Sequence, residues 1–317
     1  MTSPAHTQTL LPSMRRLLAV AAVLVFLAGV QLFVFPTRTE EYFSWTIASP
    51  MTAVFLGAAY WSAVALEVAG ARARTWVNGR IAVPTVFVFT TLTLFATLLH
   101  LDLFHFGAQH SVATQSVTWA WMAIYLAVPV LMVVITVRQR RGPGKDPPRT
   151  QRLPSWVRLA LLALVLIFGI VGLGMFLAPE ATATWWPWQL TPLTCRAVGA
   201  WLISLAVAAD HSLIENDVAR IRPLGATAAV FSGLEGVALI RYGGELDWSS
   251  LPAIGYVAVL ASLLVLGIWA LRAGGAPRGG RSVQGAGGDQ NVADKGDVVI
   301  GRVEQRPANP AGVDQAE

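Results

Sequence analysis

The sequence predicts an all-α integral membrane protein whose eight transmembrane helices form two parallel four-helix repeats. Three observations predict this fold class: the composition, eight long apolar stretches and an internal repeat. Of the 317 residues, 55% are hydrophobic and only 13% are charged. A soluble domain normally carries about a quarter charged residues, so this chain has too few polar side chains to cover a soluble surface.

Eight stretches of the chain are long and apolar enough to be transmembrane helices. A bilayer core about 30 Å thick needs roughly 20 apolar residues per helix. The sixth and seventh stretches are the shortest, because Arg196 and Asp210 lie at their ends. Pro84 and Pro129 interrupt two others, which membrane helices tolerate because neighbouring helices satisfy the freed backbone groups. The eight stretches are about 17–35, 51–69, 81–101, 118–137, 157–178, 193–209, 224–240 and 251–271.

An internal repeat relates the two halves of the chain. Four residues recur 143 positions later, namely Phe33, Pro36, Thr39 and Trp45 as Phe176, Pro179, Thr182 and Trp188. Five more recur 142 positions later, namely Pro50, Thr52, Gly57, Ala58 and Ser62 as Pro192, Thr194, Gly199, Ala200 and Ser204. Each half contains four spans, an even number, so both halves have the same orientation. The repeat is therefore parallel, with an approximate two-fold axis along the membrane normal.

These features divide the chain into five parts. An N-terminal segment (1–16) precedes the first membrane repeat (17–137), and a basic linker (138–156) separates it from the second repeat (157–272). The last part, 273–317, has no Phe, Trp, Tyr or Leu. Such a segment cannot bury enough apolar area to offset its ordering entropy, so we expect a disordered tail.

The basic residues predict the orientation of the spans. Sixteen Lys and Arg residues lie in one alternating set of loops, against Arg38 and Arg241 in the other set. Because cytoplasmic loops carry the excess of positive charge, both termini and the linker are expected in the cytoplasm. Arginine outnumbers lysine 21 to 2, a composition typical of GC-rich bacterial genomes, which indicates a bacterial inner membrane.

The first apolar stretch could also be a cleaved signal peptide, since "MRRLLAVAAVLVFLAG" has a charged start and an apolar middle. Its counterpart in the repeat, 157–178, is internal and cannot be cleaved away. We therefore expect the first stretch to remain as an anchor.

Two helix starts are candidate binding sites for an anion or a lipid headgroup. Each half has a hydroxyl residue followed by proline, which begins a helix well. A helix N-terminus carries partial positive charge and free N–H groups, and the second start adds a full charge. The alternative is a simple connection between two helices. The residues are Ser49 and Thr52 in the first half and Thr191, Thr194 and Arg196 in the second.

Glu235 stands out as an acidic residue well inside an apolar span. Ser232 shares its helix face, and small residues alongside would let another helix approach. A carboxylate facing hydrocarbon is costly, so Glu235 is predicted to face the protein interior with Ser232 as a possible partner. We expect its removal to affect function more than stability. A protonated or statically paired acid is the structural alternative.

Two clusters contain residue types that bind metals. One is "HLDLFHFGAQH", with His100, Asp102, His105 and His110. The other, 210–217, places His211 and Glu215 four residues apart, between Asp210 and Asp217. Interfacial histidines and a solvated helix end are the more ordinary explanations of the two clusters, so no metal or cofactor is assigned. The single cysteine, Cys195, excludes an internal disulfide.

Three function classes follow from these patterns. The favoured one is a non-enzymatic membrane protein that binds or moves a small solute or lipid through a pseudo-symmetric bundle. A membrane enzyme with a metal-assisted site at 210–217 or 100–110 is the second, and an assembly or scaffold subunit is the third. The expected partners are the bilayer, anionic headgroups at the 138–156 linker and a small ligand, with no nucleic acid.

Overall fold

The computed structural model describes residues 6–273, which are all-helical apart from isolated backbone bridges. Eight helical stretches in this part of the chain are long and apolar enough to cross a membrane, as the sequence predicts. They are α1 with its π-helical extension η1 (Pro12–Val34), α3 (Pro50–Arg72), α5 (Ala82–Leu99), α6 (Val112–Arg140), α7 (Ser155–Leu177), α9 (Pro192–Glu215), α10 with η4 (Val218–Glu245) and α11 (Leu251–Ala273).

Several helices extend beyond the apolar stretches because polar end residues cap them. α6 begins at Val112, where the Ser111 hydroxyl accepts a hydrogen bond from the Thr114 N–H. α9 and α10, expected to be the shortest, are 24 and 25 residues long. Since α6 ends at Arg140 and α7 begins at Ser155, the linker is shorter than the expected 138–156. The tail predicted at 273–317 lies outside the described residues, apart from Ala273.

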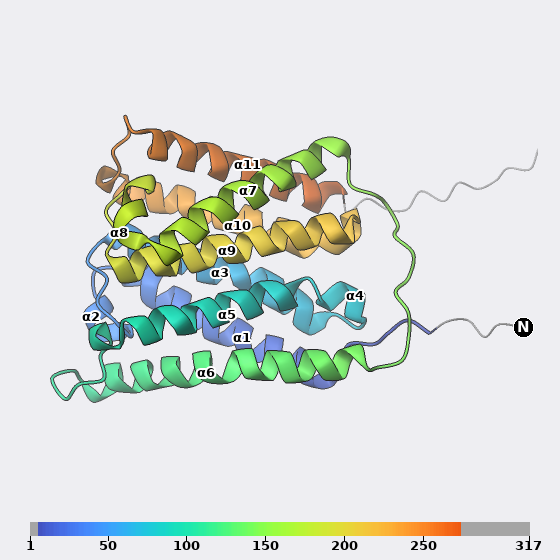
Figure 1. Ribbon diagram of the computed structural model, residues 1–317, viewed down its shortest axis with the longest axis horizontal. Coiled ribbons are helices and arrows are strands. Elements are labelled where there is room, and N and C mark those ends of the chain that lie inside the picture. Colours follow the sequence, from blue (N-terminus) through green and yellow to red (C-terminus); the bar gives the residue numbers. More distant parts are fainter. Residues whose placement is uncertain (1–5, 274–317) are drawn as a thin grey trace, which may run out of the picture. The chain divides into compact units, whose positions relative to one another are not determined.

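The helices pack as four hairpins, α1–α3, α5–α6, α7–α9 and α10–α11 (Figure 1). The main contacts between hairpins join the two halves of the chain, because α3 packs against α10 and α5 packs against α9. α3 and α5, which are neighbours in sequence, contact each other only slightly. The two halves are therefore interleaved, and both hydrophobic core clusters of the described chain contain residues of each half.

Glycine permits the close approach of the helices in two hairpins. A Cβ atom at Gly57 in α3 would lie 2.6 Å from the backbone nitrogen of Phe33, and one at Gly199 in α9 would lie 2.9 Å from that of Phe176. Such distances are too short for a side chain. The α1–α3 and α7–α9 hairpins thus each have a close approach at a glycine, and the two glycines are 142 positions apart in the sequence.

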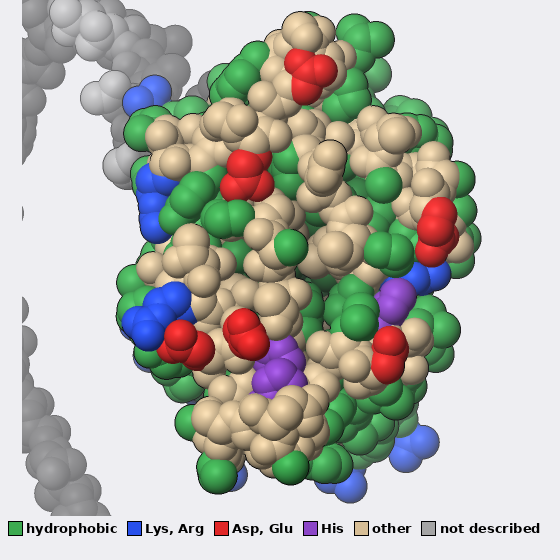
Figure 2. Space-filling model, turned by 90° about the vertical axis from the view of Figure 1, so that its left-hand side faces the viewer, with side chains coloured by type: hydrophobic (Ala, Val, Ile, Leu, Met, Phe, Trp, Pro, Cys, Tyr) green, Lys and Arg blue, Asp and Glu red, His purple; other side chains and the backbone are tan. Residues whose placement is uncertain are grey.

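The two ends of the bundle differ in chemistry. The basic end comprises the connections 73–81, 141–154 and 216–217, together with the N-terminal strand-like segment 6–10. The aromatic end comprises 35–49, 100–111, 178–191 and 243–250, which include the short helices α2 (Thr39–Tyr42) and α8 (Pro179–Thr182). Figure 2 looks onto the aromatic end, where acidic side chains and histidines are spread over the surface.

Candidate functional site

A chamber of about 190 Å³ lies inside the bundle and is lined by residues from all eight long helices. An engineered apolar cavity of about 150 Å³ binds benzene, so this volume admits a small apolar molecule or part of a longer one. The walls are almost entirely apolar. Their largest side chains are the aromatic residues Phe55, Tyr60, Phe89, Trp121, Tyr125, Phe168, Trp201, Phe231 and Trp269.

One wall of the chamber carries its main polar groups. Tyr60 and Glu67, seven residues apart, lie on one face of α3 and both line the chamber. The Tyr60 hydroxyl is hydrogen-bonded to the Tyr125 hydroxyl at 2.8 Å. Glu67 is 2% exposed, and within the described chain its Oε2 atom is buried without a hydrogen-bond partner.

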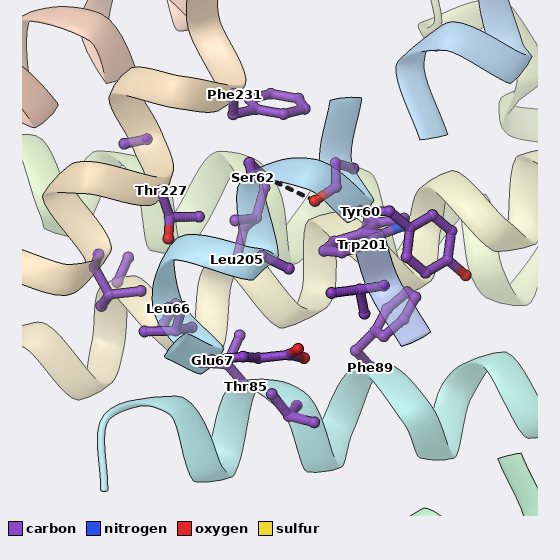
Figure 3. A pocket seen from close by; sticks show the side chains of 18 of the residues that line it. Tyr60, Ser62, Leu66, Glu67, Thr85, Phe89, Trp201, Leu205, Thr227 and Phe231 are labelled. Carbon is purple, nitrogen blue, oxygen red and sulfur yellow. Dashed lines mark hydrogen bonds between the residues drawn. The ribbon is translucent and has the colours of Figure 1, made fainter. Parts of the chain in front are cut away.

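Figure 3 shows how these residues face the chamber. Glu67 extends from α3 over α5, beside Thr85, while Trp201 and Phe231 approach from the helices of the second half. Ser62, by contrast, is satisfied locally, because its hydroxyl donates to the Ala59 carbonyl at 2.7 Å. A buried carboxyl oxygen without a partner is costly, so Glu67 is the candidate ligand-binding residue of this chamber.

Sequence reasoning missed Glu67. It lies near the end of the expected stretch 51–69, where an acidic residue looks like the edge of a span. In the structure α3 continues to Arg72, which places Glu67 more than one turn inside the helix end. The signal that could have revealed it is the position of Glu67 seven residues after Tyr60, on one face of the helix.

Glu235 is fully buried, which confirms that it faces the protein interior. Its partner differs from the one expected: the Tyr256 hydroxyl donates to Glu235 Oε2 at 2.6 Å, whereas the Ser232 hydroxyl has no partner in the described chain. Tyr256 belongs to an aromatic cluster with Phe55, Trp186 and Trp188 at the aromatic end. Glu235 does not line the chamber, and its functional role stays a prediction.

The first candidate anion site is filled by the protein itself. At the start of α3, the Ser49 hydroxyl caps the Thr52 N–H at 3.0 Å. Glu245 Oε1 accepts the Met51 N–H at 3.0 Å, and its Oε2 accepts a hydrogen bond from the Ser49 hydroxyl. The Thr52 hydroxyl accepts from Trp188 Nε1 at 2.9 Å. Glu245 therefore occupies the position in which an external anion would bind.

Replacement of Glu245 by glutamine is expected to lower the free energy of unfolding by about 1 kcal/mol, as for loss of a helix cap. Thermal unfolding in detergent measures this effect. Asp247→Asn is a suitable control, because the Asp247 side chain accepts hydrogen bonds only from Ser249, within its own turn. An equal effect of both variants would argue against the Glu245 contact with α3.

The second candidate anion site has no such carboxylate bond. Thr191 and Thr194 form a reciprocal capping box at the start of α9. Arg196 contacts His100 Nε2 at 2.6 Å. Burial, followed by the positive charge of Arg196, lowers the pKa of His100, so its ring nitrogen can accept this hydrogen bond. A headgroup at this helix start stays a prediction.

The histidines of 100–110 do not converge on one point. His105 is buried, with Nδ1 3.0 Å from the Phe43 carbonyl oxygen and Nε2 3.0 Å from the Thr46 hydroxyl. Both ring nitrogens are thus already used, and burial lowers the pKa of His105. The His110 ring lies against His105, with centroids 4.1 Å apart. Residues 6–273 hold no group of three or more His, Cys, Asp or Glu that could bind a metal ion.

The acidic residues of 210–217 are engaged in structural contacts instead. Glu215 is 1% exposed and is paired with Arg80 Nη2 at 2.9 Å and Arg220 Nη1 at 3.0 Å. Asp217 caps α10 and accepts hydrogen bonds from Thr150 in the linker. Burial alone would raise the pKa of Asp217, but these hydrogen bonds hold it below its usual value. Asp210 is exposed, and His211 Nε2 lies 3.4 Å from Glu215 Oε1 without a hydrogen bond in the described chain. Because Glu215 and Asp217 are already engaged, the four residues do not form a metal-binding group in residues 6–273.

Comparison of the chain with protein-family models, curated proteins and solved structures found no match. The functional assignment therefore depends on the chamber and its polar wall.

Proposed function

We propose that this protein is a multi-pass membrane protein that binds a small, largely apolar molecule in the central chamber. The ligand carries one hydrogen-bond donor or one positive charge, which is bound by Glu67. The observation that carries the proposal is a buried carboxyl oxygen without a partner on the wall of an apolar chamber. A bound ligand supplies that partner, so the desolvation free energy of the Glu67 carboxyl group is offset only when the ligand is present.

The positions of the lining residues give the ligand an orientation. Glu67 lies five residues before the end of α3 at the basic end, whereas Phe55 lies near the start of α3 at the aromatic end. The polar group of the ligand is thus toward the basic end. Its apolar part lies among Phe55, Trp121 and Trp201. A single-chain lipid or a short hydrophobic amine has this distribution of polarity.

Native mass spectrometry of the purified protein tests the proposal. We expect one small molecule to be retained per chain of the wild-type protein and to be lost after exchange into a harsh detergent. Undiminished retention of the same molecule by Glu67→Leu would contradict the role of Glu67. Retention only of a broad mixture of bilayer lipids would contradict a selective chamber.

The eight helices are proposed to form two parallel repeats in a bacterial inner membrane. The close approaches at Gly57 and Gly199 and the reciprocal packing of α3 on α10 and α9 on α5 support the repeat. The charge asymmetry supports cytoplasmic termini. Exposed linker-side arginines support contact with anionic headgroups; they are Arg138, Arg140, Arg141 and Arg152.

Cysteine labelling on intact cells is expected to place the two ends of the bundle on opposite sides of the membrane. Ala108 at the aromatic end and Gln151 at the basic end are both exposed. In a Cys195→Ser background, an impermeant thiol reagent should label Ala108→Cys and not Gln151→Cys. Gly144 is unsuitable as a position in the linker, because its φ of +120° disfavours a side chain. Labelling at Gln151→Cys alone would reverse the proposed orientation.

A further inference from the structure

A groove on the surface of the α1–α3 hairpin is separate from the chamber. Its volume is about 510 Å³, and its walls consist mainly of small and apolar residues. Val64 and Arg72 in α3 mark its ends, eight residues apart, which corresponds to about 12 Å along the helix axis. The residues that line it are Ala19, Ala22, Val23 and Phe26 of α1, and Val64, Val68, Ala71 and Arg72 of α3.

Two arginines lie at the basic end of this groove. Arg72 is one of its walls, and Arg15 donates a hydrogen bond from Nε to the Ala71 carbonyl at 3.0 Å. Both side chains are exposed, and neither forms a salt bridge with a carboxylate of residues 6–273. The groove end therefore presents two positive charges without an acidic partner in this part of the chain.

The opposite end of the groove is aromatic. Phe26 stacks on Trp61 with ring centroids 6.2 Å apart, and Trp61 Nε1 donates to the Phe26 carbonyl at 3.0 Å. These contacts fix the ring of Phe26 and limit the length of the groove. Its polarity thus runs from two cations at the basic end to apolar rings deeper in the span.

We propose that the groove binds one acyl chain of an anionic phospholipid, with the lipid phosphate between Arg15 and Arg72. Arginine suits phosphate because its planar guanidinium group donates paired hydrogen bonds. The groove length fits a segment of an acyl chain. This inference rests on the proposed insertion of the helices in a bilayer, and it is independent of the chamber ligand.

A second copy of the chain fits the groove less well than a lipid does. In a two-fold dimer within a membrane, the copies have the same orientation, so the same patch meets itself. The Arg15 and Arg72 side chains of both copies would then approach one another without carboxylates between them, which is unfavourable. An anionic lipid instead neutralises both arginines.

Lipid titration followed by native mass spectrometry tests this site. Delipidated protein is titrated with phosphatidylglycerol and with phosphatidylcholine of identical acyl chains. The wild type should bind the first phosphatidylglycerol molecule more tightly than phosphatidylcholine. The double variant Arg15→Gln, Arg72→Gln should lose about tenfold in that preference, from loss of two charge-assisted contacts.

A matched control comes from the α7–α9 hairpin. Arg158 lies 143 positions after Arg15 and is likewise exposed, but the residue 142 positions after Arg72 is Ile214. Arg158→Gln should therefore leave the preference unchanged. Ala19→Phe, which fills the groove without altering charge, should weaken the binding of both lipids at this site.

Three results of the lipid titration would overturn the proposal, and a phosphate competition adds a fourth. The three are equal binding of the two lipids by the wild type, an unchanged preference in the double arginine variant, and an equal loss in Arg158→Gln. An excess of inorganic phosphate should not displace the lipid, because it lacks the acyl chain. Displacement by phosphate would show a free-phosphate site and contradict the role of the groove. Helix content and melting temperature establish that each variant is folded.

Discussion

Glu67→Leu is expected to raise the stability of the ligand-free protein while lowering ligand retention about tenfold, the effect of losing one charged hydrogen bond. In the wild type, Glu67 Oε2 is buried among apolar residues without a partner in the described chain. Removing an unsatisfied buried group stabilises a protein by about 1–3 kcal/mol. Thermal unfolding of delipidated protein and native mass spectrometry of undelipidated protein measure the two effects separately.

Glu235→Leu is the comparison for Glu67→Leu. Glu235 is equally buried and its Oε1 likewise has no partner in the described chain, but its Oε2 accepts a hydrogen bond from Tyr256. Its removal leaves the Tyr256 hydroxyl unpaired, so this variant should be destabilised. A gain of stability in Glu67→Leu together with a loss in Glu235→Leu would show that Glu67 lacks a stabilising partner in the ligand-free protein, whereas Glu235 has one in Tyr256. A loss of stability in Glu67→Leu equal to that in Glu235→Leu would show that Glu67 is structural.

Glu215→Ala is expected to lower the free energy of unfolding by about 3–5 kcal/mol, the cost of removing one partner from a buried charge network. Glu215, at the end of α9, is buried and binds Arg80 and Arg220. Arg80 lies between the short helix α4 (Trp76–Gly79) and α5, and Arg220 lies in the first turn of α10. Arg149 of the linker donates to the Glu215 carbonyl at 2.8 Å. Without the Glu215 carboxylate, the buried guanidinium group of Arg220 loses its salt bridge. The melting temperature in detergent measures the change.

Asp210→Ala is the control for Glu215→Ala, because Asp210 is exposed and should change stability by less than about 0.5 kcal/mol. Equal stability of both variants would contradict the structural interpretation of 210–217. A stable Asp210→Ala protein that lost a cellular phenotype would instead favour the membrane-enzyme hypothesis.

The helices could be predicted from the sequence because their length and hydrophobicity are local properties. The inward orientation of Glu235 also followed from a local argument, the cost of exposing a carboxyl group to hydrocarbon. The contact of α3 with α10 could not be predicted, since periodicity does not say which apolar faces meet. For the same reason Glu245, almost 200 residues from Ser49 in sequence, gave no sign that it caps α3.

The chamber could not be predicted from the sequence either, because it depends on which helices pack together. It exists only where all eight helices meet, and its lining residues, such as Ala63 and Trp201, look like ordinary core positions. Glu67 is a candidate binding residue because it has no hydrogen-bond partner in the described chain, and that depends on how the helices pack. The sequence predicts a small-ligand binder with Glu235 as its intramembrane polar site, whereas the function proposed from the structure depends on Glu67.

Filling the chamber is the most direct test of the proposed function. Ala63 lines the chamber in α3, whereas Ala123 in α6 is exposed on the outside of the bundle. Native mass spectrometry should find the small molecule in wild-type protein and in Ala123→Phe, and should not find it in Ala63→Phe, which should still fold because the new ring occupies existing space. Equal retention of the molecule by Ala63→Phe and Ala123→Phe would contradict binding in the chamber.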